Sequence, residues 1–146
     1  MRIAVVNGPN LNLLGTREPG IYGTTTLADI ERRLRDVGSD IGADISFTQH
    51  NGEGEIVDAI HALRGKSDGA LVNAGAYSHS SLAIRDALTG IAIPFVEVHL
   101  TNIYAREPER RHSVLASAAV AVVCGFDAES YELALRGLVR KLEKNG

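Results

Sequence analysis

Short apolar runs alternate with longer amphipathic segments along this chain, and the alternation restricts the fold more than any other feature of the sequence. The short runs are rich in β-branched residues, as buried strands are. The expected strands are Arg2–Val6, Ala43–Gln49, Gly69–Asn73, Pro94–His99 and Ala119–Cys124. Strands separated by helices form parallel sheets with right-handed crossovers. The pattern predicts an α/β fold, a flavodoxin-like doubly wound five-stranded parallel sheet with helices on both faces.

The segments between the strands place their apolar residues at helical spacing. These positions are Leu27, Ile30, Leu34 and Val37, then Ile56, Ile60 and Leu63, then Ala83 to Leu88, and last Tyr131, Leu135, Leu138 and Leu142. Thr26 and Asp29 have the spacing of a capping pair at the start of the first helix. Because the sequence contains no internal repeat, linker or low-complexity segment, we expect one domain over residues 1–146.

Composition excludes several classes of partner. The chain has 15 basic and 18 acidic residues and a net charge of -3, so it has no general attraction to nucleic acid or to a membrane surface. The longest apolar run, near Ala118–Cys124, is too short to cross a bilayer. The first residues lack the pattern of a signal peptide, and we expect the single cysteine, Cys124, to be a buried thiol. A cytoplasmic location is therefore expected.

Polar side chains follow four of the expected strands. They are Asn7 and Asn10, then Gln49, His50 and Asn51, then Asn73, and finally His99. In parallel sheets the ligand crevice lies beyond the carboxyl ends of the strands, so this edge is the predicted site. The alternative is that asparagine and histidine serve here only as turn formers.

The opening loop NGPNLNLLGTREPGIYG, from Asn7 to Gly23, is long and rich in glycine and proline, which is typical of a working loop. Within it, Tyr22 follows Arg17 by five positions. A nearby guanidinium favours the phenolate of a tyrosine, which could then act as a base. The alternative is a tyrosine that closes the loop onto the surface and an arginine in solvent.

Two further clusters carry candidate chemistry. In NAGAYSHSSLAIRDAL, Gly75 permits a close backbone approach and Ser80 or Ser81 can cap the next helix. In EVHLTNIYAREPERRHS, Glu97 and His99 share one face of a strand, so the carboxylate could hold the imidazole as a general acid. A purely structural ion pair is the alternative.

The chain lacks a dinucleotide fingerprint, a phosphate-binding loop, a serine nucleophile elbow and paired metal-ligand spacing among its histidines. What remains is a set of Arg, Tyr, His and Asn side chains. That set suits a substrate that bears a carboxylate, because arginine binds carboxylates in bidentate geometry, and it suits proton transfer without a cofactor.

Taken together, these segments resemble the type II 3-dehydroquinate dehydratases, the shikimate-pathway enzymes that convert 3-dehydroquinate to 3-dehydroshikimate. The resemblance covers nearly the whole chain. Its most specific segments are NGPNLNLLGTREPGIYG, QHNGEGEI, NAGAYSHSSLAIRDAL and EVHLTNIYAREPERRHS, in the order of the family.

The resemblance implies a metal-free anti elimination of water through an enolate, with no cofactor. It implies that Tyr22 is the base, that Arg17 lowers its pKa, that Asn10 binds a water at the enolate, and that His99, oriented by Glu97, is the acid. It also implies a lid at about 17–24 and a homododecamer, a tetramer of trimers. The substrate-binding residues that it implies are Asn73, His79, Leu100, Thr101, Arg110 and, from a neighbouring subunit, Asp86.

The chain departs from the family pattern at a few positions. The family usually has proline at Ala74, serine at Thr101, and a phenylalanine before the arginine that precedes His112, in the stretch where Arg110 stands. Either Arg110 or Arg111 could be the substrate arginine, and we favour Arg110. These departures leave one competing hypothesis, a flavodoxin-like binding or regulatory module that has lost turnover.

Overall fold

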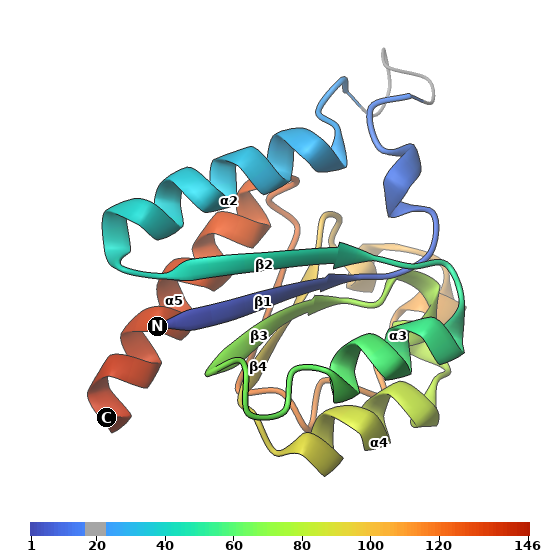
Figure 1. The fold of residues 1–146 in the computed structure, drawn as a ribbon. Helices are drawn as coiled ribbons and strands as arrows, with labels where there is room; N and C mark the ends of the chain where they lie inside the picture. The colour runs from blue at the N-terminus through green and yellow to red at the C-terminus, as the bar shows by residue number, and fades with distance from the viewer. Residues whose placement is uncertain (17–22) are drawn as a thin grey trace.

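The computed structural model describes residues 1–16 and 23–146 (Figure 1). Arg17, Tyr22 and most of the segment expected to be a lid lie outside the described residues. Within the described residues, the strands are β1 (Arg2–Asn7), β2 (Asp44–Gln49), β3 (Gly69–Asn73), β4 (Phe95–His99) and β5 (Ala121–Cys124). They form one parallel sheet in the order β2-β1-β3-β4-β5, which confirms the predicted flavodoxin-like topology.

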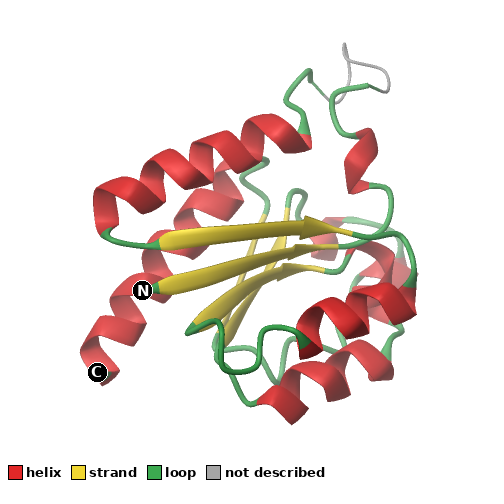
Figure 2. Cartoon of the chain, viewed as in Figure 1, coloured by secondary structure: helices red, strands yellow, loops and turns green. Residues whose placement is uncertain are grey.

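The α-helices of this described part cover both faces of the sheet, as Figures 1 and 2 show. They are α2 (Leu27–Ile41), α3 (Glu53–His61), α4 (Leu82–Ile91) and α5 (Glu129–Asn145). Alternation along β1 divides the core, because successive strand side chains point to opposite faces. Ile3 and Val5 pack in the cluster that includes α2 and α5, whereas Ala4 and Val6 pack in the cluster that includes α3 and α4.

Local signals in the sequence set the starts of two helices. Thr26 and Asp29 form the predicted capping box of α2, in which each side chain accepts from the other residue's backbone N–H. Ser81 caps α4, since its Oγ accepts from the N–H of Ile84 at 3.0 Å. The second of the two candidate caps, rather than Ser80, therefore has this role.

The strand β5 differs from the expectation. It lies at one edge of the sheet, and Ala121 and Val122 are exposed. Cys124, predicted to be buried, is only half-buried. The same apolar sequence pattern is found in central strands and in edge strands. An edge strand has one neighbouring strand instead of two, so less of it is covered.

The carboxyl ends of the strands lead into short 3-10 helices: η1 (Leu11–Leu13), η2 (Gly75–His79), η3 (Ile103–Ala105) and η4 (Pro108–Arg110). The turns after β1 and β3 touch, because the N–H of Gly8 donates to the carbonyl of Asn73 at 2.7 Å. Gly75, at a φ of +59°, lies so close to Pro9 that an added Cβ would be 3.2 Å from it. These contacts bring the segments after β1 and β3 to one edge of the sheet.

Candidate active site

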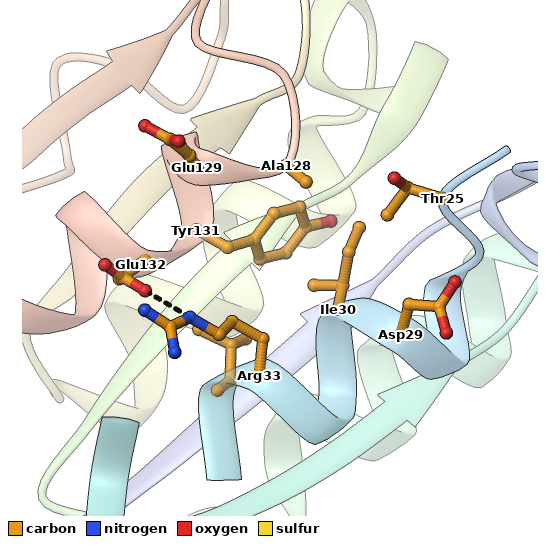
Figure 3. A pocket seen from close by; sticks show the side chains of 9 residues that line it. Thr25, Asp29, Ile30, Arg33, Ala128, Glu129, Tyr131 and Glu132 are labelled. Atoms are coloured by element: carbon orange, nitrogen blue, oxygen red, sulfur yellow. Dashed lines mark hydrogen bonds and ion pairs between the residues drawn. The ribbon is translucent and has the colours of Figure 1, made fainter. Parts of the chain in front are cut away.

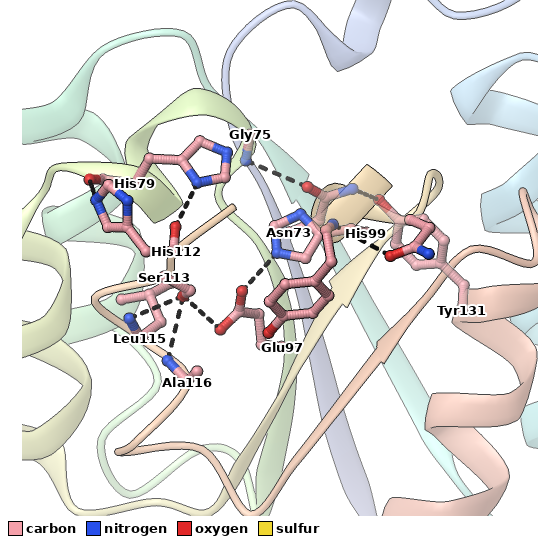
Figure 4. A network of polar contacts seen from close by, with 12 residues as sticks. Asn73, Gly75, His79, Glu97, His99, His112, Ser113, Leu115, Ala116 and Tyr131 are labelled. Carbon is pink, nitrogen blue, oxygen red and sulfur yellow. Dashed lines mark hydrogen bonds and ion pairs between the residues drawn. The ribbon is translucent and has the colours of Figure 1, made fainter. Parts of the chain in front are cut away.

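The end of β4 carries a buried acid and imidazole. Glu97 is fully buried and His99 is 5% exposed, and their side chains lie 2.5 Å apart between Glu97 Oε2 and His99 Nε2 (Figure 4). The second carboxylate oxygen, Glu97 Oε1, accepts from the hydroxyl of Ser113 at 2.7 Å. The predicted shared face of Glu97 and His99 is thus confirmed, and both carboxylate oxygens have a donor.

This contact selects the tautomer of His99. A carboxylate accepts hydrogen bonds, so His99 Nε2 carries a proton and Nδ1 is the nitrogen that gains or loses one. Within the described part of the chain, Nδ1 has no hydrogen-bond partner. Such an arrangement, an imidazole held by a carboxylate that is kept out of water, is typical of a general acid.

A pair of histidines stands beside His99. The ring of His79 is stacked on that of His99, with centroids 6.2 Å apart and an interplanar angle of 14°. His79 Nδ1 donates to the carbonyl of His112 at 2.7 Å, and His112 Nε2 donates to the carbonyl of His79 at 3.0 Å. This reciprocal pair, which we call the histidine clamp, ties η2 to the loop after η4.

Asn73, at the end of β3, is held by a buried chain of hydrogen bonds (Figure 4). Its Nδ2 donates to the hydroxyl of Tyr131 at 2.9 Å, and its Oδ1 accepts from the N–H of Gly75 at 3.2 Å. The hydroxyl of Tyr131 donates in turn to Asn7 Oδ1 at 2.6 Å, and Asn7 Nδ2 donates to the carbonyl of Thr48 at 3.1 Å. The amide of Asn73 therefore has a fixed orientation.

Tyr131 is the centre of that chain. It is fully buried, and burial raises the pKa of its phenol above the ordinary value, an effect that the hydrogen bond from Asn73 partly offsets. The hydroxyl consequently stays protonated and remains a donor to Asn7. The residue predicted only as part of the apolar face of the last helix also orients a site residue.

Arg110 and the histidine clamp border a hollow of about 600 Å³, lined by Ala76, His79, Ser80, Glu107, Glu109, Arg110 and His112. Arg110 is ion-paired with Glu107. Hydrogen bonds from its own backbone and from Arg110 hold the pKa of Glu107 below its ordinary value. Arg111 instead donates from Nε to the carbonyl of Arg106 at 2.5 Å, and it does not line the hollow.

Other predicted residues are placed less tightly. Asn10 follows β1 at a φ of 69°, and its N–H donates to Asn51 Oδ1 at 3.0 Å. Leu100 is half-buried and Thr101 exposed, directly after His99. Asp86 is exposed on α4 and does not line the hollow.

Two of the strand-end amides are used within the protein instead of facing the crevice. Asn7 is fully buried in the chain that includes Tyr131. Gln49 donates from Nε2 to the carbonyl of Gly8 at 3.1 Å and to Asn51 Oδ1 at 3.0 Å. These amides connect the turns that carry the site.

A smaller hollow of about 200 Å³ lies between α2 and α5 (Figure 3). Ile30 and Tyr131 form part of its wall, and Arg33 and Glu132 pair across it at 2.7 Å. None of the predicted site residues that the structure describes lines this hollow. Among the described residues, it adjoins the candidate active site only through Tyr131, whose hydroxyl bonds to Asn73.

Two further features concern residues 1–16 and 23–146. No group of three His, Cys, Asp or Glu side chains is arranged to hold a metal ion. None of the helices in these ranges is long and apolar enough to span a bilayer.

Two residues of the site were not predicted from the sequence. Ser113 ends the EVHLTNIYAREPERRHS segment, where a serine after charged residues is an ordinary loop residue. Tyr131 was predicted only as one of the apolar positions of the last helix, without a role for its hydroxyl. A tyrosine among leucines on a buried helix face is a usable signal, since a buried phenol needs a hydrogen-bond partner.

The sheet order defines a flavodoxin-like α/β protein, and the polar groups at the ends of β3 and β4 are of the kind that can transfer a proton. Residues 1–139 match the family described as Dehydroquinase class II, and the chain belongs to that family.

Similar proteins agree with this assignment. A 3-dehydroquinate dehydratase of Gemmatimonas aurantiaca is 61% identical over 98% of this chain and 94% of that protein. A 3-dehydroquinate dehydratase of a Synechococcus species is 58% identical over 97% of each chain. The crystal structure of the type II dehydroquinase from Propionibacterium acnes has a TM-score of 0.89 and 41% identity, and covers 95% of this chain and 96% of that one.

Proposed function

We propose that this protein is a 3-dehydroquinate dehydratase, a hydro-lyase that forms 3-dehydroshikimate in the shikimate pathway or in quinate breakdown. Family membership and the names of relatives at 58–61% identity support this function. The observation that carries it in this chain is the buried pair of Glu97 and His99, which ends β4 beside Asn73 and His79. A binding module would have no need of a buried carboxylate that holds an imidazole.

In the proposed mechanism, Tyr22 as phenolate removes a proton from the carbon beside the ketone of the substrate. Arg17 favours the phenolate and stabilises the charge that develops. The resulting enolate is held through a water bound by Asn10. The segment at about 17–24 is proposed to act as a lid that excludes water from this step.

His99 then protonates the departing hydroxyl, and the two steps give anti elimination of water. Glu97 holds the imidazole of His99 in place through the contact between its Oε2 and Nε2. Asn73, His79, Leu100 and Thr101 are proposed to hold the hydroxyls and the carboxylate of the substrate. Arg110 is proposed to bind the carboxylate, a role supported by its position on the hollow beside His79.

The test is ultraviolet absorbance after purified protein is mixed with 3-dehydroquinate, with and without a chelator. Growth of the conjugated enone-carboxylate band, unchanged by the chelator, is expected. The Tyr22→Phe variant should bind the substrate but lose turnover. No absorbance change from a folded wild-type protein would refute the proposed activity and favour the binding module.

The assembly proposed for the family, a homododecamer built as a tetramer of trimers, would bring Asp86 to the site of a neighbouring subunit. Leu82, one helical turn before Asp86 on α4, is 62% exposed, which leaves an apolar side chain on the same face for a neighbour. Sedimentation that shows only monomer at micromolar concentration would refute this assembly.

We also propose a cytoplasmic location and no requirement for a cofactor.

A further inference from the structure

The hydroxyl of Ser113 is fixed from two sides. Its Oγ accepts from the N–H of Leu115 at 3.0 Å and from the N–H of Ala116 at 3.2 Å (Figure 4). A serine hydroxyl has two lone pairs and one proton, so both acceptor positions are occupied. The proton is left to point at Glu97 Oε1, 2.7 Å away.

Glu97 needs this donor. A fully buried carboxylate is costly unless its oxygens are hydrogen-bonded, and the donors to Glu97 in the described residues are Ser113 and His99. With Ser113 on one oxygen, the other oxygen is directed at His99 Nε2. The direction of one hydroxyl proton therefore sets the orientation of the carboxylate and, through it, of the imidazole.

We infer that Ser113 is a positioning residue for the dehydration, one that aims Glu97 and thereby holds His99 as the Nε2–H tautomer with Nδ1 free for proton transfer. The inference rests on the proposed function. Ser113 touches neither the substrate nor the transferred proton, and acts only through Glu97. The histidine clamp supports this geometry, because it anchors His112, the residue directly before Ser113, to η2.

The chain contains a matched control in Ser81. Its Oγ also accepts a backbone N–H, from Ile84, and also donates to a glutamate, Glu53, at 2.5 Å. Glu53, however, lies exposed at the start of α3 and is not bonded to a histidine in the described part of the chain. Ser81→Ala removes a comparable bond from a backbone N–H and a comparable serine–glutamate bond without touching the pair of Glu97 and His99.

Several titratable groups surround His99 in the described residues. Glu97 precedes it on β4, His79 is stacked on it from η2, and Cys124 is its register partner on β5. From α5, Tyr131 bonds to Asn73 and stays protonated. Of these groups, Glu97 alone is bonded to Ser113, so the loss of the serine hydroxyl acts on His99 through one carboxylate.

The experiment compares kcat, KM and the pH profile of wild type, Ser113→Ala, Ser113→Thr and Ser81→Ala with 3-dehydroquinate. The free energy of a hydrogen bond to a buried charge is enough to change a rate constant by a factor of about ten to a hundred. Ser113→Ala should therefore lower kcat by that factor with little change in KM. The dependence of its kcat on pH should also differ from that of wild type, because the carboxylate that contacts the proton-donating imidazole is no longer held in place. Ser113→Thr should restore most of the rate, and Ser81→Ala should leave the pH profile unchanged.

The imidazole of His99 can also be observed without turnover. Nitrogen NMR of labelled histidine should show the Nε2–H tautomer in wild type and a mixture of tautomers in Ser113→Ala. A wild-type pH profile and tautomer in folded Ser113→Ala would overturn the inference. So would a Ser113→Thr variant as slow as Ser113→Ala. If wild type itself does not turn over 3-dehydroquinate, the proposed function fails, and the tautomer in Ser113→Ala still decides the role of Ser113.

Discussion

Replacing Tyr131 with phenylalanine tests whether the buried hydrogen-bond chain stabilises the fold. The ring stays in place, so no cavity forms, but two buried groups lose their partner: the Nδ2–H of Asn73 and the Oδ1 of Asn7. Each orphaned group costs about 1–3 kcal/mol, or about 2–6 kcal/mol for the pair. The variant no longer has to desolvate a hydroxyl, which returns about 1–3 kcal/mol.

The net expectation for Tyr131→Phe is a loss of about 1–3 kcal/mol in the free energy of unfolding. Urea denaturation at one protein concentration measures it, because assembly makes apparent stability depend on concentration. Tyr77→Phe is the matched control, since among the described residues that hydroxyl has one hydrogen-bond contact, of 3.3 Å to the carbonyl of Asn51. The control should change stability by less than about 0.5 kcal/mol.

The reasoning would be refuted if Tyr131→Phe matched wild type within the error of the control. A second readout separates stability from function. Because Tyr131 orients the amide of Asn73, the variant should also raise KM for 3-dehydroquinate. An unchanged KM would show that the amide keeps its orientation through the 3.2 Å contact with Gly75 alone.

Three further predictions concern charge and packing. Arg110→Ala should raise KM with a smaller effect on kcat, whereas Arg111→Ala should change both little; steady-state kinetics that give the reverse would reassign the carboxylate-binding arginine. The N–H of Arg2 holds the pKa of Asp68 below its ordinary value, so the stabilisation is present at neutral pH and is lost as pH falls through the folded-state pKa. Melting curves of wild type and Asp68→Asn should therefore differ at neutral pH, begin to converge near about pH 4, and coincide only below the lowered folded-state pKa. Gly8→Ala would place a Cβ 2.5 Å from a backbone carbonyl oxygen in the turn after β3, and calorimetry should show a loss of about 1–3 kcal/mol.

The sequence predicted the strands and helices well because their signals are local, although Leu63, expected on the second helix, lies beyond the end of α3 at His61. Periodicity and β-branched runs predicted each strand to within two residues, and the spacing of Thr26 and Asp29 predicted the first capping box. The exposure of β5 could not be predicted, because the number of neighbouring strands is a property of the sheet. For the same reason the burial of Cys124 was overestimated.

The site was predictable where its residues act along one strand, and less so where they meet across elements. Glu97 and His99 are two positions apart, so strand alternation alone places them together. Ser113 reaches Glu97 from 16 residues away, and the phenol of Tyr131 reaches Asn7 across 124 residues. Only the folded chain brings such partners together, and no local pattern records their contact.

The histidine clamp has a consequence for work at different pH values. In each bond a ring N–H donates to a carbonyl of the other residue, through Nδ1 of His79 and Nε2 of His112. Adding a proton to the opposite nitrogen of either ring introduces charge but removes neither donor. The clamp thus holds in the neutral and the cationic forms alike, so the loop that carries Arg110 and Ser113 keeps its anchorage to η2 while neighbouring groups titrate.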